Sequence, residues 1–314
     1  MFNIAVAQSG GPTAAINSSL AGVFAGASVS PEIDCIYGSV NGIEGIINDN
    51  VIDLKKILTS DYDIDLLKRT PSTVLGSCRY KLKDPSDDPS DYQKIASTLE
   101  KHNIRAFFYI GGNDSMDTVM KLDAYFKENH INIKVIGVPK TIDNDVMNTD
   151  HTPGFGSAAK YVATTLQEII RDSRVYSIPS VTIVEIMGRD AGWLTCASAL
   201  GRRVDGFEPD LVYLPERDFD TDKFLFDVRA ALERHPNVVI AVSEGIKSAD
   251  GKYVCELLGS GSTDVFGHTQ LTGCGKALEH LVKREIGCKV RSIELNLPQR
   301  CASHLASKTD LDES

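Results

Sequence analysis

The residues best suited to chemistry stand in one short segment, Pro139–Asp145, directly after an apolar run at residues 133–138. Asp143 and Asp145 are two residues apart, and Lys140 lies three residues before Asp143. Such an apolar run predicts a buried strand, and open α/β sheets carry their chemistry where strands end. One carboxylate could accept a hydroxyl proton, the other could help hold a metal, and the lysine could neutralise a phosphate. Alone, the segment could equally be an Asx-rich turn that caps the next helix.

Two further loops place paired glycines between a predicted strand and a predicted helix. These pairs are Gly10–Gly11 and Gly111–Gly112. Glycine allows the backbone to approach a ligand closely, and the free N–H groups at a helix N-terminus attract anions. The second loop continues into Asn113 and Asp114, which could reach a metal ion, and into Ser115, which could cap the helix. Each loop could be a simple tight turn, but two together favour a shared phosphate site.

Other candidates are scattered polar residues at turns and strand ends. Singly, each has an ordinary interpretation as a surface cation or a strand cap. They are Arg79 after a glycine turn, the step Met187, Gly188 and Arg189, Glu244 at the end of a strand, and the basic residues Arg291 and Arg300.

Short β-branched runs alternate with helical patterns along the whole chain. Apolar residues recur at helical spacing from residue 156 to about 174, and a second helical run covers residues 14 to about 26. The alternation predicts an α/β fold with two Rossmann-like lobes, in which mostly parallel sheets are covered by helices. The predicted strands are Asn3–Gln8, Cys35–Val40, Ala106–Ile110, Lys134–Val138, Val181–Met187, Leu211–Leu214, Val238–Ser243 and Val290–Leu295.

The C-terminal residues, Ser307–Ser314, carry helix-starting signals, yet the sequence predicts no helix after them. We therefore expect the C-terminus to be truncated.

Composition narrows the class of protein. The 314 residues carry a net charge of −10 without a Lys/Arg block, which argues against nucleic-acid and anionic-membrane partners. The N-terminus lacks a signal peptide pattern, and no apolar run reaches the length of a membrane span. The seven cysteines are scattered without metal-ligand spacing. We expect free thiols and a cytoplasmic location.

Read together and in order, these motifs resemble the phosphofructokinase family. The resemblance implies transfer of a phosphoryl group to the 1-hydroxyl of fructose 6-phosphate with Mg²⁺, by a homo-oligomer (a dimer or a tetramer). It also implies a phosphate-donor lobe at 1–145, which 297–314 could rejoin, and a sugar-phosphate lobe at 146–296. The matching blocks, which span nearly the whole chain, are Gln8–Thr13, Gly76–Arg79, Gly111–Ser115, Pro139–Asp145, Met187–Gly192, Ser243–Gly245 and Arg291–Arg300.

The resemblance also implies a role for each matched residue. Asp143 corresponds to the general base, Asp145 to a second carboxylate of the catalytic loop, and Thr141 to a hydroxyl that contacts sugar and phosphate. The donor phosphates would contact Gly11, Arg79, Gly112, Asp114 and Lys140; the sugar would contact Met187, Gly188, Arg189 and Glu244; its 6-phosphate would contact Arg291 and Arg300; and Mg²⁺ would be held by Asn113 and Asp114, with Asp145 as a third candidate.

Two positions indicate the phosphoryl donor. ATP-using members of the family usually carry glycine at the positions of Asp114 and Lys140, so this pair resembles the pyrophosphate-dependent branch. A carboxylate at residue 114 would repel the α-phosphate of a nucleotide. Like charges about 4 Å apart cost about 4 kcal/mol at an effective dielectric constant of about 20, which corresponds to roughly a thousandfold. We therefore predict pyrophosphate as the donor.

Three residues depart from the family pattern. Asn113 replaces a usual aspartate, Leu297 replaces a histidine, and Ser180 replaces an arginine that completes a neighbouring subunit's site.

Three alternative functions remain open. They are an ATP-dependent sugar kinase of the same fold, a non-catalytic phosphofructokinase-like subunit that binds metabolites, and a kinase of the NAD or diacylglycerol type. Asp143 and Asp145 argue against the non-catalytic subunit, and the third alternative leaves most motifs unexplained.

Overall fold

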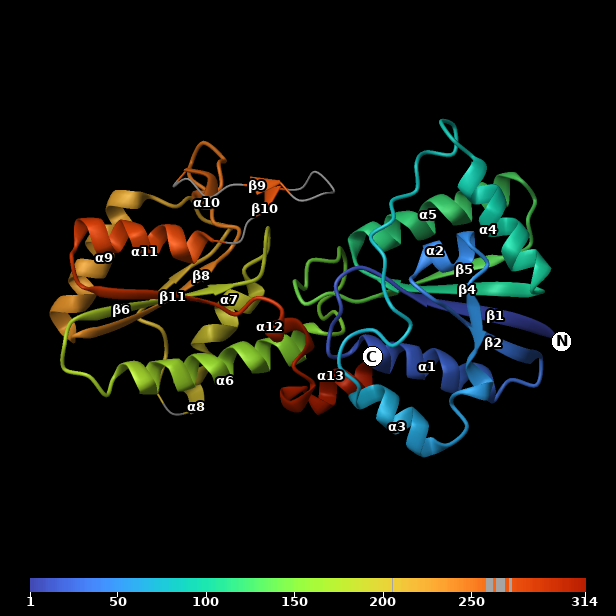
Figure 1. The fold of residues 1–314 in the computed structure, drawn as a ribbon, viewed down its shortest axis with the longest axis horizontal. Helices are drawn as coiled ribbons and strands as arrows, with labels where there is room; N and C mark the ends of the chain where they lie inside the picture. Colours follow the sequence, from blue (N-terminus) through green and yellow to red (C-terminus); the bar gives the residue numbers. More distant parts are fainter. Residues whose placement is uncertain (205, 258–261, 264–268, 271–272) are drawn as a thin grey trace. The chain divides into compact units, whose positions relative to one another are not determined.

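The computed structural model describes residues 1–204, 206–257, 262–263, 269–270 and 273–314. The chain divides into two compact units, each built around its own sheet (Figure 1). The first unit contains Met1–Ile142, Val146–Ser157 and Arg300–Ser314. The second contains Asp143–Asp145 and Ala158–Gln299. Asp143 and Asp145 therefore group with the second unit, although Lys140 and Thr141 group with the first.

The first unit contains a five-stranded sheet in the order β3-β2-β1-β4-β5. Strands β2, β1, β4 and β5 are parallel, and β3 is antiparallel to β2 at the edge. Parallel strands place all their carboxyl ends at one edge of the sheet, so the loops after β1, β4 and β5 are neighbours. The strands are β1 Phe2–Gln8, β2 Ile33–Ser39, β3 Val51–Asp53, β4 Ile104–Gly111 and β5 Lys134–Pro139.

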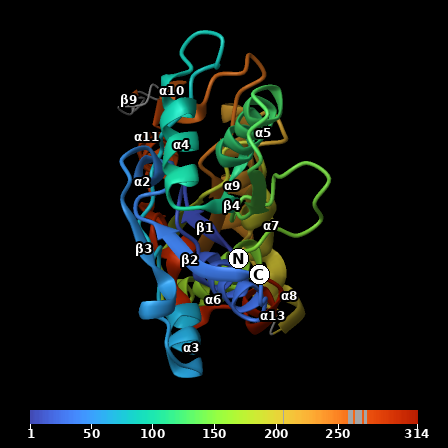
Figure 2. The same ribbon diagram turned by 90° about the vertical axis from the view of Figure 1, so that its right-hand side faces the viewer.

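Helices cover both faces of this sheet, because successive residues of a strand point to opposite sides. On β1, Ile4 and Val6 pack with the helices α1 and α3, whereas Ala5 and Ala7 pack with α2, α4 and α5. Figure 2 shows α3 on one side of the sheet and α2 and α4 on the other. The helices are α1 Ile16–Ser28, α2 Ile43–Ile47, α3 Asp61–Arg69, α4 Ser90–Lys101 and α5 Asn113–Glu128, with a 3₁₀ turn at Leu54–Lys56.

The second unit contains a four-stranded parallel sheet in the order β11-β6-β8-β7. Its central strand β8 is buried along its whole length. Helices α9 and α11 pack on one face, and Figure 1 shows α6 along the other. The strands are β6 Ser180–Ile186, β7 Leu211–Tyr213, β8 Asn237–Ser243 and β11 Lys289–Glu294; a short pair, β9 Ser262–Thr263 and β10 Thr269–Gln270, is separate.

The remaining helices lie around this sheet and at the C-terminal end of the chain. They are α6 Phe155–Ser173, α7 Trp193–Ala197, α8 Gly201–Val204, α9 Thr221–Arg234, α10 Val254–Leu257, α11 Cys274–Glu285, α12 Pro298–Cys301 and α13 Lys308–Glu313, with 3₁₀ turns at Ser198–Leu200 and Ser303–Leu305. None of the helices in the described ranges is long and apolar enough to cross a membrane.

The predicted α/β fold with mostly parallel sheets is confirmed. All eight predicted strands are present, with ends that differ by at most two residues. The helix-starting signals found in Ser307–Ser314 do begin a helix. Ser307 Oγ accepts a hydrogen bond from Asp310 N at 3.4 Å, and this cap begins the short helix α13.

Candidate active site

The first glycine loop is held in place by the segment Gly76–Arg79. Gly10 N donates to the carbonyl of Cys78 at 3.1 Å, and Ser77 Oγ donates to the carbonyl of Gly10 at 2.6 Å. Gly10 has a φ of +73°, in the left-handed region that favours glycine. Arg79 is exposed and adjoins Cys78. The motif that contains Arg79 therefore lies against the loop that contains Gly11, although the two are far apart in sequence.

The second glycine loop lies beside the first, because β1 and β4 are parallel neighbours with Gln8 opposite Ile110. The hydroxyls of Ser9 and Ser115 hydrogen-bond to each other at 2.5 Å and join the two loops. The prediction that Ser115 caps α5 is therefore wrong. Gly112 occupies the N-cap position, and the Ser115 side chain is buried against the first loop instead.

Two cations approach the first glycine loop. Lys140 is only 3% exposed, and its Nζ lies 3.3 Å from the position that a Cβ on Gly10 would take. Arg300 Nη1 lies 3.0 Å from the corresponding position on Gly11. A side chain at either glycine would therefore crowd a cation, whereas glycine leaves room for the cation beside the backbone. Exposed backbone and two positive charges together suit a phosphate group.

Asn113 and Asp114 occupy the first turn of α5, and both are exposed. The helix dipole favours a carboxylate at this end, and the position leaves the Asp114 oxygens accessible. Amide and carboxylate oxygens belong to the donor set that Mg²⁺ prefers, and Mg²⁺ usually keeps several waters and substrate oxygens as its other ligands. The chemistry of these two side chains therefore fits the predicted metal.

The segment Lys140–Asp145 turns sharply after β5. Lys140 N donates to the carbonyl of Gly111 at 2.9 Å and extends the pairing of β4 with β5 by one residue. Asn144 has a φ of +55°, which asparagine tolerates better than most residues. Asp143 on one side of this turn is half-buried, and Asp145 on the other is exposed. The two carboxylates thus have different environments.

In the second unit, the loop after β6 is held by two other segments. Met187 N donates a hydrogen bond to Gln299 Oε1 at 3.1 Å, and Gly188 N donates one to Glu244 Oε1 at 3.4 Å. Ser243 Oγ donates to the carbonyl of Gly188 at 2.5 Å. Three predicted sugar residues, Met187, Gly188 and Glu244, therefore belong to one cluster, and the exposed Arg189 directly follows Gly188. Gln299 and Ser243 hold this cluster; both lie in motifs identified in the sequence, but neither was predicted as a site residue.

Arg291 does not join this cluster. It lies on β11 opposite Thr182 of β6. Met187 directly follows β6 and is five residues beyond Thr182. At about 3.3 Å per residue, Arg291 is roughly 16 Å from Met187 along the sheet. Arg300, the other residue expected at the sugar phosphate, groups with the first unit and lies beside Gly11.

A buried carboxylate lies close to the sugar-side cluster. Glu185 on β6 is 4% exposed, and burial raises its pKa to about 7, with Glu294 and Glu244 adding to the shift. Its oxygens accept hydrogen bonds from Gly275 N at 2.6 Å and Gly273 N at 3.3 Å, which oppose that shift. Glu185, Glu244 and Glu294 also line one small pocket. Glu185 thus adds a group that titrates near neutral pH.

The raised pKa of Glu185 predicts a pH-dependent stability. The folded state binds a proton at Glu185 more tightly than the unfolded chain does. The stability that this proton adds is fully present below about pH 4.5 and is lost as the pH rises through about 7. The difference amounts to about 3 kcal/mol, since one pKa unit is about 1.4 kcal/mol. Urea unfolding of wild type and Glu185→Gln between about pH 5 and 8 should show a falling wild-type curve and a flatter variant curve. The control Glu233→Gln, at an exposed position of α9, should follow wild type.

The paired glycine loops, the carboxylates after β5 and the cations beside Gly10 and Gly11 define a phosphotransferase of the α/β class. The family profile described as Phosphofructokinase matches residues 3–293. The chain belongs to the phosphofructokinase family. The resemblance inferred from the motifs is confirmed.

Three similar proteins extend this finding. A protein of Xanthomonas campestris pv. campestris named pyrophosphate–fructose 6-phosphate 1-phosphotransferase is 43% identical over 99% of this chain and 74% of its own length. A sulfofructose kinase of Alkalicoccus urumqiensis is 33% identical over 100% of this chain and 77% of its own length. The crystal structure of a pyrophosphate-dependent phosphofructokinase from Marinobacter aquaeolei superposes with a TM-score of 0.85 at 35% identity, covering 100% of this chain and 73% of that one.

Proposed function

We propose that this chain transfers a phosphoryl group from Mg²⁺-bound pyrophosphate to the 1-hydroxyl of fructose 6-phosphate, reversibly, as a cytoplasmic homo-oligomer. The observation that carries the proposal is the buried Lys140, whose Nζ lies beside Gly10 in a family where ATP users usually carry glycine at that position. A compact ammonium suits the dense charge of pyrophosphate. The name of the Xanthomonas relative supports the same donor and acceptor.

The reaction requires a base, a nucleophile and a leaving group. Asp143 accepts the proton of the sugar 1-hydroxyl as the hydroxyl oxygen attacks the terminal phosphorus. The bond from that phosphorus to the bridging oxygen breaks, and inorganic phosphate leaves. Thr141 contacts sugar and phosphate, and Asp145 is the second carboxylate of the loop. Positioning and charge neutralisation provide most of the acceleration, because the protein forms no covalent bond with the phosphoryl group in such a transfer.

The donor side consists of backbone and cations from the first unit. Gly11 and Gly112 offer backbone to the phosphates, while Arg79 and Lys140 neutralise their charge. Asn113 and Asp114 would hold Mg²⁺, and Asp145 is a third candidate ligand. When bound, Mg²⁺ neutralises charge on the pyrophosphate oxygens. Asp114 also excludes nucleotides through repulsion of an α-phosphate.

The acceptor side consists of the cluster after β6. Met187 and Gly188 present backbone to the sugar, Arg189 offers a cation, and Glu244 accepts sugar hydroxyls. The resemblance assigns the 6-phosphate to Arg291 and Arg300. For Arg300, the neighbouring Gly11 favours a contact with the transferring phosphate instead.

The variant Arg300→Gln distinguishes these two roles. Loss of one charge-assisted contact costs about 1.5–3 kcal/mol, or roughly tenfold to a hundredfold in affinity. We expect this increase in the KM for pyrophosphate, with a smaller change in the KM for fructose 6-phosphate. Steady-state kinetics with each substrate varied in turn measures both. Arg105→Gln, at an exposed site on β4, is the control. An increase confined to the sugar KM would restore the 6-phosphate role.

The acceptor can be tested by ³¹P NMR of the chain with Mg²⁺, pyrophosphate and one sugar at a time. Fructose 6-phosphate should give a new phosphomonoester and inorganic phosphate in equal amounts. The similarity to a sulfofructose kinase makes sulfofructose the second candidate acceptor. Faster turnover with sulfofructose, or with sedoheptulose 7-phosphate, would replace the proposed acceptor while keeping the phosphotransferase class.

A further inference from the structure

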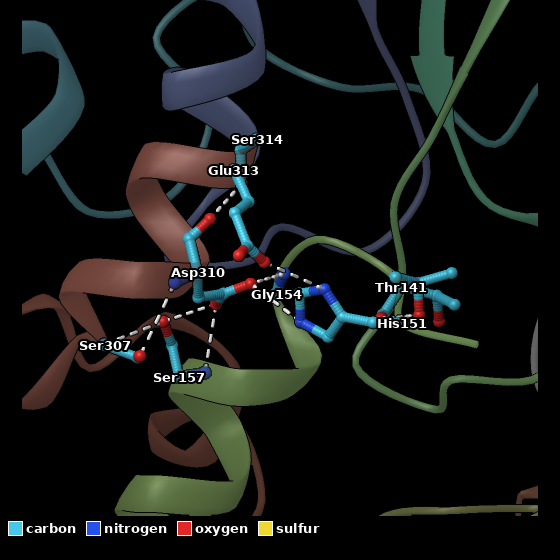
Figure 3. A network of polar contacts seen from close by, with 9 residues as sticks. Thr141, His151, Gly154, Ser157, Ser307, Asp310, Glu313 and Ser314 are labelled. Atoms are coloured by element: carbon cyan, nitrogen blue, oxygen red, sulfur yellow. Dashed lines mark hydrogen bonds and ion pairs between the residues drawn. The ribbon is translucent and has the colours of Figure 1, made fainter. Parts of the chain in front are cut away.

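The short C-terminal helix α13 inserts a carboxylate into the start of α6 (Figure 3). Asp310 is 1% exposed. Its Oδ1 accepts a hydrogen bond from Gly154 N at 2.9 Å, and its Oδ2 accepts from Ser157 N at 2.9 Å and from Ser157 Oγ at 2.5 Å. Hydrogen bonds to an ionised acceptor are about twice as strong as neutral ones, and this one carboxylate takes three.

Other polar groups fix the same junction. Ser307 N donates to Ser157 Oγ at 3.0 Å, so Ser157 is held by both ends of the first turn of α13. His151 Nε2 lies 3.5 Å from Asp310 Oδ1, and His151 Nδ1 lies 3.8 Å from Glu313 Oε2. Figure 3 shows Ser157 from the first turn of α6 and His151 from the segment before α6 beside the Asp310 carboxylate. The junction is therefore held from several directions.

The backbone that Asp310 holds is joined to the catalytic loop. Gly154 forms an isolated parallel bridge with Thr141, and Thr152 Oγ1 donates to the carbonyl of Thr141 at 3.0 Å. Thr152 is fully buried, and Gly154 has a φ of +103° that few other residues adopt. A Cβ on Gly154 would lie 2.7 Å from Thr13 Cβ, so this backbone has little freedom to move. Thr141 precedes the proposed base, Asp143, by two residues.

We propose that Asp310 is a positioning residue for phosphoryl transfer, acting through Gly154 and Thr141 on the loop that carries Asp143. This inference rests on the proposed function. A displacement of about 1 Å at a catalytic group can cost about a hundredfold in rate, even when its cause lies away from the reacting atoms. Asp310 controls such a displacement because it fixes the strand-like pairing of residue 154 with residue 141.

A carboxylate that only capped α6 would behave differently. Its loss would lower stability, and the folded fraction would keep its turnover number. A positioning carboxylate changes the turnover of folded protein, because the bond from Gly154 to Asp310 fixes the loop in the native state. Amide exchange in residues 139–157 reports the same coupling without any enzyme assay.

The test uses Asp310→Asn, which preserves shape while removing the charge and one acceptor. We expect kcat per folded molecule to fall at least about tenfold, with KM for both substrates within about threefold of wild type. Exchange in residues 139–157 should accelerate, and exchange in α9 should stay unchanged. The matched control Asp312→Asn lies on the same short helix and is exposed, and it should resemble wild type in every measurement.

Thr152→Val gives an independent route if Asp310→Asn fails to fold. It removes the hydroxyl that bonds to Thr141, so kcat should fall, and Thr152→Ser should restore it. Where both variants fold, the double variant should lose less than the product of the two single losses, because both act through Thr141.

Unchanged kcat in Asp310→Asn, or independent effects of residues 310 and 152, would overturn the positioning role. An inactive wild-type chain would overturn the proposed function and this inference with it. An active wild type with an equally active Asp310→Asn variant would overturn this inference alone.

Discussion

Replacing Asp143 with serine is expected to lower kcat by about 10²–10⁴-fold, the usual contribution of a general base. The KM for fructose 6-phosphate should stay within about threefold of wild type, because the sugar contacts are assigned to other residues. Serine is small enough for the half-buried position of Asp143 and cannot accept the proton as a carboxylate does. Steady-state kinetics with saturating pyrophosphate and Mg²⁺ measures both constants.

Asp150→Ser is the matched control for this experiment. Asp150 is an exposed aspartate seven residues further along the same loop region, and the proposal gives it no role. It should retain wild-type kinetics. If Asp143→Ser instead raised the sugar KM while kcat remained unchanged, Asp143 would be a binding residue and the assignment of the base would be wrong.

Replacing both Asp114 and Lys140 with glycine is expected to weaken the use of pyrophosphate and admit ATP. Loss of the Lys140 cation removes an electrostatic attraction to phosphate of about 4 kcal/mol, for charges about 4 Å apart at an effective dielectric constant of about 20. The kcat/KM for pyrophosphate should therefore fall by roughly a thousandfold. Loss of the carboxylate removes a repulsion of similar size against a nucleotide. Turnover with ATP should therefore appear once Asp114 is removed, and the double variant should show it together with the loss of pyrophosphate use.

The two single variants separate the contributions. Lys140→Gly should carry most of the loss with pyrophosphate, and Asp114→Gly should relax the exclusion of ATP. Asp117→Gly, also in α5, controls for the cost of glycine in a helix, which is about 1 kcal/mol. A double variant that retains full activity with pyrophosphate would contradict the argument that these residues select the donor.

The sequence allowed the fold and the position of the two glycine loops to be predicted, because both depend on local patterns. The β-branched runs located eight strands, and the glycine pairs located the loops that receive Lys140 and Arg300. The antiparallel strand Val51–Asp53 was missed, since three residues carry no readable periodicity. Helix α3 was also missed, although Ser60 and Asp63 form a capping box that the sequence could have revealed.

The rest of the site depends on contacts between distant segments, which no local pattern encodes. Gln299 bonds to Met187 across 112 residues, and Asp310 bonds to Gly154 across 156. Ser115 looked like a helix cap because its position fits one, but the neighbouring strand brought Ser9 to its hydroxyl. The roles of the individual site residues and the division into lobes at residues 145 and 296 stay predictions.

The central claim is the use of pyrophosphate, and the most direct measurement compares donors. The purified chain is given fructose 6-phosphate and Mg²⁺ with either pyrophosphate or ATP as the sole donor, and formation of fructose 1,6-bisphosphate is followed. Turnover with pyrophosphate and at least about a thousandfold lower kcat/KM with ATP is the predicted result. Equal or faster turnover with ATP would contradict the roles of Asp114 and Lys140. A folded chain that turns over neither donor would contradict the proposed reaction and favour a non-catalytic subunit that binds phosphorylated metabolites.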